Sequence, residues 1–150
     1  MFKNFRRNIV KMFREFLVYH NSSLEFRAKV LTLMIASNDE INKCEESLLL
    51  EIAHQIYSKN PSRAEILIDT VYEFFEKIKT DNGLDLEHLI MQVERETRTV
   101  KRFSSKIDIP TLKRFSTCLK KENDIIFHQR VIEFLERLKK DYDGVEIKKR

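Results

Sequence analysis

Two Asn-Asp pairs, Asn38-Asp39 and Asn123-Asp124, are the first candidates for chemistry in this sequence. Asn and Asp side chains hydrogen-bond to nearby backbone groups and favour turns, so each pair can end one helix and begin the next. A carboxylate beside such a corner can also bind a hard cation, because calcium and magnesium prefer oxygen ligands. We therefore predict two structural corners, with a divalent-cation site as the alternative; its ligands would be Asp39, Glu45 and Asp124.

Glu51 and His54 have the Glu-x-x-His spacing with which di-iron helical bundles hold metal. Such a site needs a second copy, and Glu136 is followed by Lys139 where a histidine is required. Both side chains also lie off the neighbouring apolar stripe, so we expect them to face solvent. The other three histidines have no neighbour at the spacing of a zinc site or an activated nucleophile. We predict no catalytic residue and no resident cofactor, so the chain is not expected to be an enzyme.

A basic surface offers a second kind of chemistry, the binding of nucleic-acid phosphates. Phe103 lies nearby in the sequence as a group on which a base could stack. The net charge of +4 is modest, and no motif that reads bases is present. Nucleic-acid binding is therefore the alternative hypothesis, and it would use Arg95, Arg98, Arg102, Lys106, Lys113 and Arg114.

Residues 1–20 are predicted to form a basic amphipathic helix that is part of the domain or docked on it. Phenylalanines recur every three or four residues, and basic residues occupy the other side. Such a helix can pack on the bundle, pair with a second copy of the chain, or lie on an anionic membrane surface. The residues predicted to contact a partner or a membrane are Phe2, Phe5, Arg6, Arg7, Lys11 and Arg14.

The elements that position all these residues are predicted to be helices. The chain has 150 residues and only 2 Gly and 2 Pro, whereas strands and hairpins need such turn residues often. Asn42 with Glu45, and Ser62 with Glu65, have the spacing of N-terminal capping boxes. The fold class is therefore predicted as all-α, a single compact bundle of about seven helices with breaks at residues 21–23, 38–40, 60–62, 81–83, 104–108 and 123–124.

Cys44 and Cys118 are far apart in the sequence and have no partner at metal-binding spacing. We interpret them as buried thiols of a reducing compartment and expect no disulfide. No apolar run approaches the ~20 residues that span a bilayer, and the charged N-terminus is unlike a secretory signal. A cytoplasmic location is expected.

The sequence also predicts an internal helix–loop–helix duplication, in which residues 26–57 align with residues 111–142. The alignment places Asn-Asp-x-Ile in the loop of both units. A repeated unit is economical, because each copy must bury its apolar face against a partner. The identical pairs are Thr32 and Thr117, Asn38 and Asn123, Asp39 and Asp124, Ile41 and Ile126, Leu50 and Leu135, Glu51 and Glu136, and Tyr57 and Tyr142.

The segment Ala36–Glu45, which reads Ala-x-Asn-Asp-Glu-Ile-x-x-x-Glu, resembles the acidic loop of the TerB-like family, named after tellurite resistance. That family is all-helical, has two related halves, and carries Asp-Gly-x-Ile/Val with a Glu four residues later. Here Asn38 stands in place of the Asp and Glu45 matches the Glu, whereas Arg130 replaces the Glu in the second half. The resemblance covers residues 24–142 and implies an interaction module of stress-response complexes near the inner membrane face.

These observations lead to one expectation about function. The chain is predicted to be a non-enzymatic, TerB-like protein-interaction module in the cytoplasm, with a peripheral position at the inner membrane face as a further prediction. Its expected partner is a protein, with a second copy of the chain and a membrane surface as further candidates. The predicted organisation is an N-terminal helix over residues 1–20, a TerB-like domain over residues 21–143 and a basic tail over residues 144–150.

Overall fold

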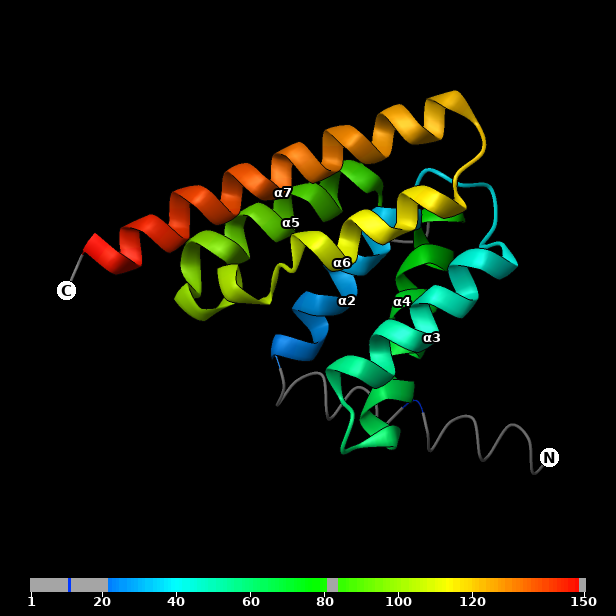
Figure 1. Ribbon diagram of the computed structural model, residues 1–150, viewed down its shortest axis with the longest axis horizontal. Helices are drawn as coiled ribbons and strands as arrows, with labels where there is room; N and C mark the ends of the chain where they lie inside the picture. The colour runs from blue at the N-terminus through cyan, green and yellow to red at the C-terminus, as the bar shows by residue number, and fades with distance from the viewer. Residues whose placement is uncertain (1–10, 12–21, 81–83, 149–150) are drawn as a thin grey trace.

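The computed structural model describes residue 11 and residues 22–80 and 84–148, and every regular element in these ranges is a helix. The prediction of an all-α bundle of about seven helices is confirmed within this part of the chain. Figure 1 shows the arrangement, with α7 as the longest helix along one edge. The elements are α2 (Ser22–Ile35), α3 (Lys43–Ile56), α4 (Pro61–Lys79), α5 (Leu86–Thr99), α6 (Ile109–Lys113) and α7 (Glu122–Lys148), with the 3-10 helices η1 (Lys101–Lys106) and η2 (Arg114–Cys118).

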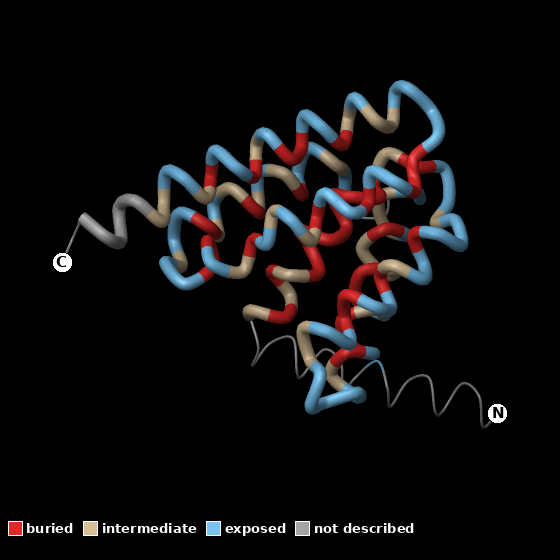
Figure 2. The backbone as a smooth tube through the Cα atoms, viewed as in Figure 1, coloured by how far each residue is buried: buried red, intermediate tan, exposed pale blue. Residues whose placement is uncertain are grey.

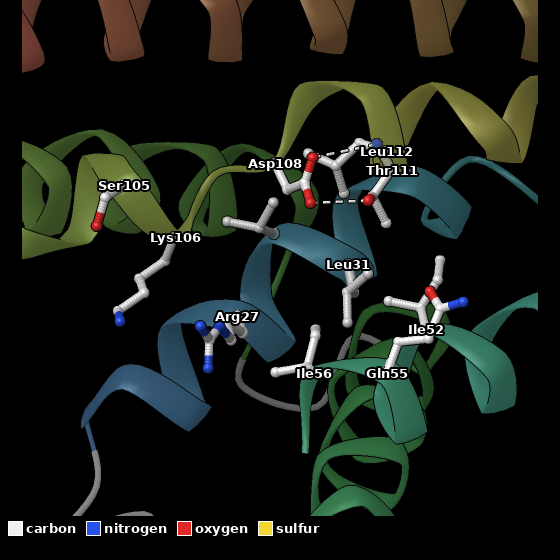
Figure 3. Close-up of a pocket in the computed structure, with 11 residues that line it drawn as sticks. Arg27, Leu31, Ile52, Gln55, Ile56, Ser105, Lys106, Asp108, Thr111 and Leu112 are labelled. Carbon is white, nitrogen blue, oxygen red and sulfur yellow. Dashed lines mark hydrogen bonds between the residues drawn. The ribbon is translucent and has the colours of Figure 1, made fainter. Parts of the chain in front are cut away.

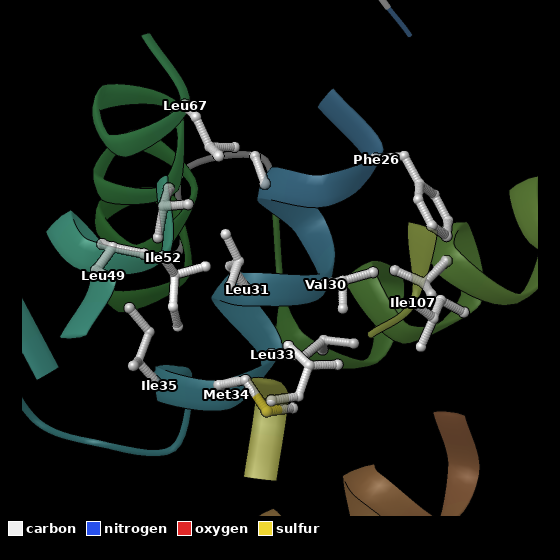
Figure 4. Close-up of a cluster of buried hydrophobic side chains, with 14 of the residues drawn as sticks. Phe26, Val30, Leu31, Leu33, Met34, Ile35, Leu49, Ile52, Leu67 and Ile107 are labelled. Carbon is white, nitrogen blue, oxygen red and sulfur yellow. The ribbon is translucent and has the colours of Figure 1, made fainter. Parts of the chain in front are cut away.

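Helix α2 forms the centre of the fold, because it has almost no polar face. Nearly all its side chains from Leu24 to Ala36 are buried, as Figure 4 shows for several of them. The helix contacts α4 on one side and α5, η1 and α7 on others. Lys29 is the buried exception, and its ammonium lies 2.5 Å from Glu96 Oε2 and 3.6 Å from Glu25 Oε1. These carboxylates compensate a charge that would be costly to bury alone.

The caps of α3 and α4 show where local sequence signals succeed and fail. Asn42 Oδ1 accepts from the Glu45 N–H at 2.8 Å, and Glu45 Oε1 accepts from the Asn42 N–H at 3.1 Å, so the predicted capping box is confirmed. The predicted cap at Ser62 is wrong. Asn60 is the N-cap of α4, and its side-chain oxygen accepts from the Arg63 N–H at 3.2 Å. The helix starts at Pro61, before Ser62, because proline suits the first helical position.

The C-terminal half departs from the predicted repeat. Asn38-Asp39 lies in the loop before α3, whereas Asn123-Asp124 lies inside the first turn of α7. The predicted break at residues 123–124 is wrong, because Leu119 and the two residues after it make the turn and an acidic side chain is favourable at a helix N-terminus. The Asn-Asp corner is therefore not repeated structurally.

Two further boundaries differ from the sequence prediction. Residues 104–106, predicted to be irregular, belong to η1, which runs directly on from α5. Helix α7 continues to Lys148, so it includes most of the predicted basic tail of residues 144–150. Figure 2 shows buried positions of α7 alternating with exposed ones, so this long helix presents one buried stripe to the bundle.

His128 fixes α7 against α6. Its side chain is buried, and its Nε2 lies 3.2 Å from the carbonyl oxygen of Leu112. Burial lowers the pKa of His128 below the ordinary value of 6.5, although the backbone hydrogen bond opposes that change. A neutral ring can donate its Nε2–H to Leu112, which ties the start of the C-terminal helix to the short helix before it.

Cys44 and Cys118 form a disulfide, so the expectation of two free buried thiols is wrong. Cys44 lies in the first turn of α3 and Cys118 ends η2, and their Cα atoms are 5.4 Å apart. This separation is typical of disulfides. The sequence carried no local signal for the pair, because only the packing of η2 against α3 brings together cysteines 74 positions apart.

We predict that removing this disulfide destabilises the fold by about 4 kcal/mol, because the bridge closes a long loop and so restricts the unfolded chain. Urea unfolding of the oxidised chain, of the reduced chain and of the Cys44→Ser/Cys118→Ser variant measures the effect. The reduced chain and the variant should unfold at the same lower urea concentration, and reductant should not change the variant. Equal midpoints for the oxidised and reduced chains would contradict the prediction.

Candidate functional site

A cavity of about 270 Å³ opens between α2, α3 and the segment that joins η1 to α6. We call it the central cleft, and Figure 3 shows how its side chains converge from these elements. Helices α2 and α3 follow one another in the chain, whereas the third wall comes from the segment after α5. The cleft is lined by Arg27, Val30, Leu31, Ile52, Gln55, Ile56, Ser105, Lys106, Asp108, Thr111 and Leu112.

The floor of the central cleft is aliphatic. Leu31 of α2, Ile52 of α3 and Leu112 of α6 are each buried, and Ile56 is half-buried. In Figure 3, Arg27 and Lys106 lie at one end of the cleft, which we call its charged end. Ile52 and Gln55 lie at the opposite end, and Leu31 and Ile56 lie between the two ends. The cleft therefore offers an apolar surface that becomes cationic toward one end.

Arg27 is held in place at the charged end. Its Nη1 donates to the hydroxyl of Tyr57 at 3.3 Å, and its guanidinium carbon lies 5.5 Å from the centre of the Tyr57 ring. Arg63 lies over the same ring at 4.9 Å. A guanidinium fixed in this way loses little freedom on binding a carboxylate, because its planar fork is already oriented.

Lys106 supplies the second cation. It is half-buried at the end of η1, and no carboxylate of the described segments pairs with it. Asp108, the acidic residue of the lining, is already engaged as the N-cap of α6: its carboxylate accepts from the Thr111 N–H at 3.3 Å and from the Thr111 hydroxyl at 2.8 Å. The charged end therefore has an excess of positive charge available to a ligand.

The hydroxyl groups of the central cleft serve local structure. The Ser105 hydroxyl donates to the Arg102 carbonyl at 2.7 Å, and the Thr111 hydroxyl donates to Asp108. Among the described residues, the lining includes no His and no Cys to act as a base or a nucleophile. The geometry can thus bind an aliphatic group that carries a negative charge, through burial at one end and ion pairing at the other.

The sequence did not predict the cleft as a site; of its lining residues, only Lys106 had a predicted binding role, as part of a basic surface. A weak signal was present in α2, where the charged Arg27 and Lys29 interrupt an apolar run. The ion pairs with Glu96 and Glu25 account for the charged side chain of Lys29 inside the fold. Arg27 is the charged residue of this run that lines the cleft.

Asn38 and Asp39 of the first Asn-Asp pair and Asp124 of the second line another cavity, of about 330 Å³, which we call the corner pocket. The ε-ammonium of Lys121 lies 3.7 Å from Asp39 Oδ2 across this pocket. Within the described segments, no group of three or more His, Cys, Asp or Glu side chains is placed to hold a metal. The predicted ligands Asp39 and Asp124 thus share a pocket without forming a metal centre with Glu45. The pocket is lined by Asn38, Asp39, Glu40, Asn42, Cys118, Leu119, Lys120, Lys121 and Asp124.

Glu45, predicted as a metal ligand, is a fully buried cap residue instead. Its carboxylate accepts from the Asn42 N–H and from Nδ2 of the buried Asn38. Burial raises the pKa of Glu45 above 4.5, helped by the negative charge of Asp124 and opposed by the hydrogen bonds from Asn42 and Asn38. In the part of the chain described, Oδ1 of Asn38 is buried and accepts no hydrogen bond.

Three residues of the predicted nucleic-acid surface form ion pairs with carboxylates. Arg98 pairs with Glu94 at 3.1 Å, Lys113 with Glu136 at 3.8 Å, and Arg114 with Glu51. Arg95 and Arg102 are exposed. The structure does not provide the expected stacking group.

Phe103 was the predicted stacking group, and its side chain is buried. The ring stacks on Phe26 with 4.5 Å between centroids. Its apolar ring fills the space between η1 and α2, because burying a phenylalanine stabilises the fold more than exposing it. A base could therefore not reach it in this structure.

Two other predicted groups have simpler outcomes. Glu51 and His54 are both exposed, as expected from their position off the apolar stripe. Of the predicted partner- or membrane-contacting residues, Lys11 is helical and exposed. The remaining ones, Phe2, Phe5, Arg6, Arg7 and Arg14, lie outside the described residues.

We predict that Glu45→Gln raises the free energy of unfolding at neutral pH by about 1 kcal/mol, because a neutral amide removes a buried charge, still accepts from Asn42 and can donate to Asn38 Oδ1. A folded-state pKa above 4.5 means that protonated Glu45 favours folding. That contribution is complete below pH 4.5 and is lost as the pH rises through the raised pKa. The advantage of Glu45→Gln should therefore grow across this window.

Urea unfolding at acidic and neutral pH measures the effect of Glu45→Gln. Glu46→Gln is the matched control, since Glu46 is the exposed neighbour in the same helical turn. An equal effect of Glu45→Gln at both pH values would show that its charge does not affect folding.

Comparison with known proteins gives no family for this chain. No protein-family model, no curated protein and no solved structure matches it. Among the described residues, no helix is both long and apolar enough to cross a membrane. Any statement about function therefore depends on the geometry of the two cavities.

Proposed function

We propose that the chain is a non-enzymatic protein-interaction module whose central cleft binds a short acidic segment of a partner protein. In this proposal, an aliphatic side chain of the segment enters the apolar floor and a neighbouring carboxylate reaches Arg27 and Lys106. The observation that carries the proposal is the half-buried Lys106, which has no carboxylate partner in the described segments and lies beside Arg27 at the end of an apolar cavity.

The size of the cleft supports a side chain as occupant. Small-molecule and cofactor sites usually occupy roughly 300–1,000 Å³, and the central cleft is about 270 Å³. The cleft also has one apolar end and one cationic end, which matches two adjacent side chains of a peptide. An acidic segment would be attracted from a distance by the same charges that bind it, because complementary charge increases association rates.

A nucleic acid fits the cleft less well. Phosphate binding could use the exposed Arg95, but Lys113 and Arg114 already pair with carboxylates and the Arg102 guanidinium lies 5.1 Å from the centre of the Phe103 ring. A flat base also has no exposed aromatic partner at Phe103. Nucleic-acid binding remains the alternative hypothesis, and it predicts an affinity that falls steeply with salt concentration and is insensitive to the apolar floor of the cleft.

The TerB-like resemblance and the cytoplasmic location stay predictions. Different settings of Asp39 and Asp124 weaken the resemblance, because its two-half pattern depends on equivalent corners. The disulfide would persist only in an oxidising compartment, because disulfides are usually transient in the cytosol. A role in stress response depends on that resemblance, whereas contact with a membrane surface or a second copy depends on residues 1–20, of which only residue 11 is described.

We predict that a fluorescein-labelled peptide with a central leucine flanked by acidic residues binds the chain, and that Lys106→Glu weakens binding by roughly tenfold or more, or about 1.4 kcal/mol. Fluorescence anisotropy measures both affinities. The charge reversal should act because it places a carboxylate against the acidic segment at the charged end of the cleft.

Lys101→Glu is the matched control, because Lys101 is an exposed lysine of the same 3-10 helix and does not line the cleft. It should leave the affinity nearly unchanged. A peptide with serine in place of leucine should bind more weakly, because it loses the apolar contact. Equal losses for Lys106→Glu and Lys101→Glu, or no binding of the leucine peptide, would exclude the proposed site.

A further inference from the structure

We infer that the Cys44–Cys118 disulfide is a thiol–disulfide exchange site, at which a dithiol attacks Cys44 and releases the end of η2 from α3. The inference concerns the disulfide and the corner pocket beside it, and it holds whether or not the central cleft binds a peptide. It gives a role to a part of the fold that the proposed function does not use.

The two cysteines differ in accessibility. Cys44 lies in the first turn of α3 and is exposed, whereas Cys118 is buried, with only 4% of its surface exposed. A thiolate must reach one sulfur along the axis of the S–S bond, so access decides which cysteine is attacked. The geometry selects Cys44 as the attacked residue and Cys118 as the leaving group.

Charges of both signs lie on the side of the leaving group. Cys118 lines the corner pocket together with Lys120 and Lys121 and with the carboxylates of Asp39, Glu40 and Asp124. Lys120 is exposed and has no ion-pair partner in the described segments, while Lys121 pairs with Asp39. A neighbouring lysine stabilises a thiolate, so Lys120 favours the departure of Cys118.

The exchange proceeds in two balanced steps. One thiolate of the dithiol attacks Cys44 Sγ, forming a mixed disulfide with Cys44 and breaking the bond to Cys118, whose sulfur leaves as a thiolate and takes up a proton. The second thiol of the reductant loses its proton and attacks its own sulfur in the mixed disulfide, which releases Cys44. The dithiol is oxidised to a disulfide, and the protein gains two thiols.

Reduction should loosen the corner without unfolding the domain. The remaining contacts at this point include the hydrogen bond from Asn42 Nδ2 to the Cys118 carbonyl at 3.3 Å and the Arg114–Glu51 ion pair. Phe115 is fully buried and keeps η2 anchored. Released motion is therefore confined to residues 118–121 and to the corner pocket that they line.

Helix η2, which ends at Cys118, follows a helix that lines the central cleft. Helix α6, which supplies Thr111 and Leu112 to one wall, continues directly into η2, while α3 supplies the facing wall. The disulfide therefore links the start of α3 to the segment that continues from α6.

The test is the rate at which dithiothreitol reduces the folded, full-length chain, followed by alkylation of free thiols and mass spectrometry. Direct attack on an accessible disulfide predicts a rate that rises in proportion to the dithiothreitol concentration. A rate that is independent of that concentration and equal to the global unfolding rate would overturn the inference, because the disulfide would then be reachable only in the unfolded chain.

Two further measurements make the test specific. Glutathione should form its mixed disulfide at Cys44, and peptide mapping that finds it at Cys118 would contradict the assigned direction of attack. Lys120→Glu should slow reduction by roughly threefold or more, whereas the control Lys101→Glu should not, because Lys120 lines the corner pocket and Lys101 is not among its lining residues. Equal rates for the two variants would remove the role assigned to the pocket.

Amide hydrogen exchange of the reduced chain reports the structural consequence. Residues 118–121 should exchange roughly tenfold faster or more after reduction, while the amides of α2 keep their protection. Unchanged exchange at residues 118–121 would show that the disulfide does not hold this corner, and loss of protection throughout the chain would show that reduction unfolds it.

Discussion

The burial of α2 on nearly every side is the constraint on which the rest of the fold depends. A helix with so few polar side chains must be covered all round, and no single neighbouring helix can do this. Helix α4 covers one side, while α5, η1 and α7 cover others. Lys29 is the one buried cation within this helix, and its pairing with Glu96 fixes α5 in register against α2. A buried ion pair of this kind specifies position more than it adds stability.

Both cavities arise at the edges of this covering. The central cleft lies where α2 is flanked by α3 and by the short segment from η1 to α6, whose brief helices cannot cover the surface as a long helix would. Arg27 is placed there because α2 is only half-buried at this position. The corner pocket lies at the other end of α3, where the loop after α2 meets the start of α7. The disulfide lies beside the corner pocket and couples α3 to η2, which continues from the helix at the wall of the central cleft.

Features that depend on neighbours in the sequence were predictable. The apolar stripes gave the helical elements, and Asn42 with Glu45 gave the start of α3, because each signal acts within one or two turns of helix. The exposure of Glu51 and His54 followed from the same periodicity. Boundaries were less predictable where two local signals competed, as at Asn60 and Ser62, where the position of Pro61 decided the start of the helix.

Features that depend on distant contacts were not predictable. The Cys44–Cys118 bridge, the meeting of Asp39 with Asp124 in one pocket and the burial of Phe103 against Phe26 all arise from tertiary packing. The carboxylate of Glu45 was read as a ligand because its type and position fit a cation site. Its cap role and its complete burial became visible only once α3 was placed against the loop that carries Asn38.

Native-state hydrogen exchange of the oxidised chain tests most directly whether α2 is the element on which the fold depends. If it is, the α2 amides are the slowest to exchange, and their opening free energy equals the global free energy of unfolding measured in urea. The account would be contradicted if the opening free energy of the α2 amides were lower than the global free energy of unfolding while α4, α5 and α7 remained protected. The surrounding helices would then stay folded without α2.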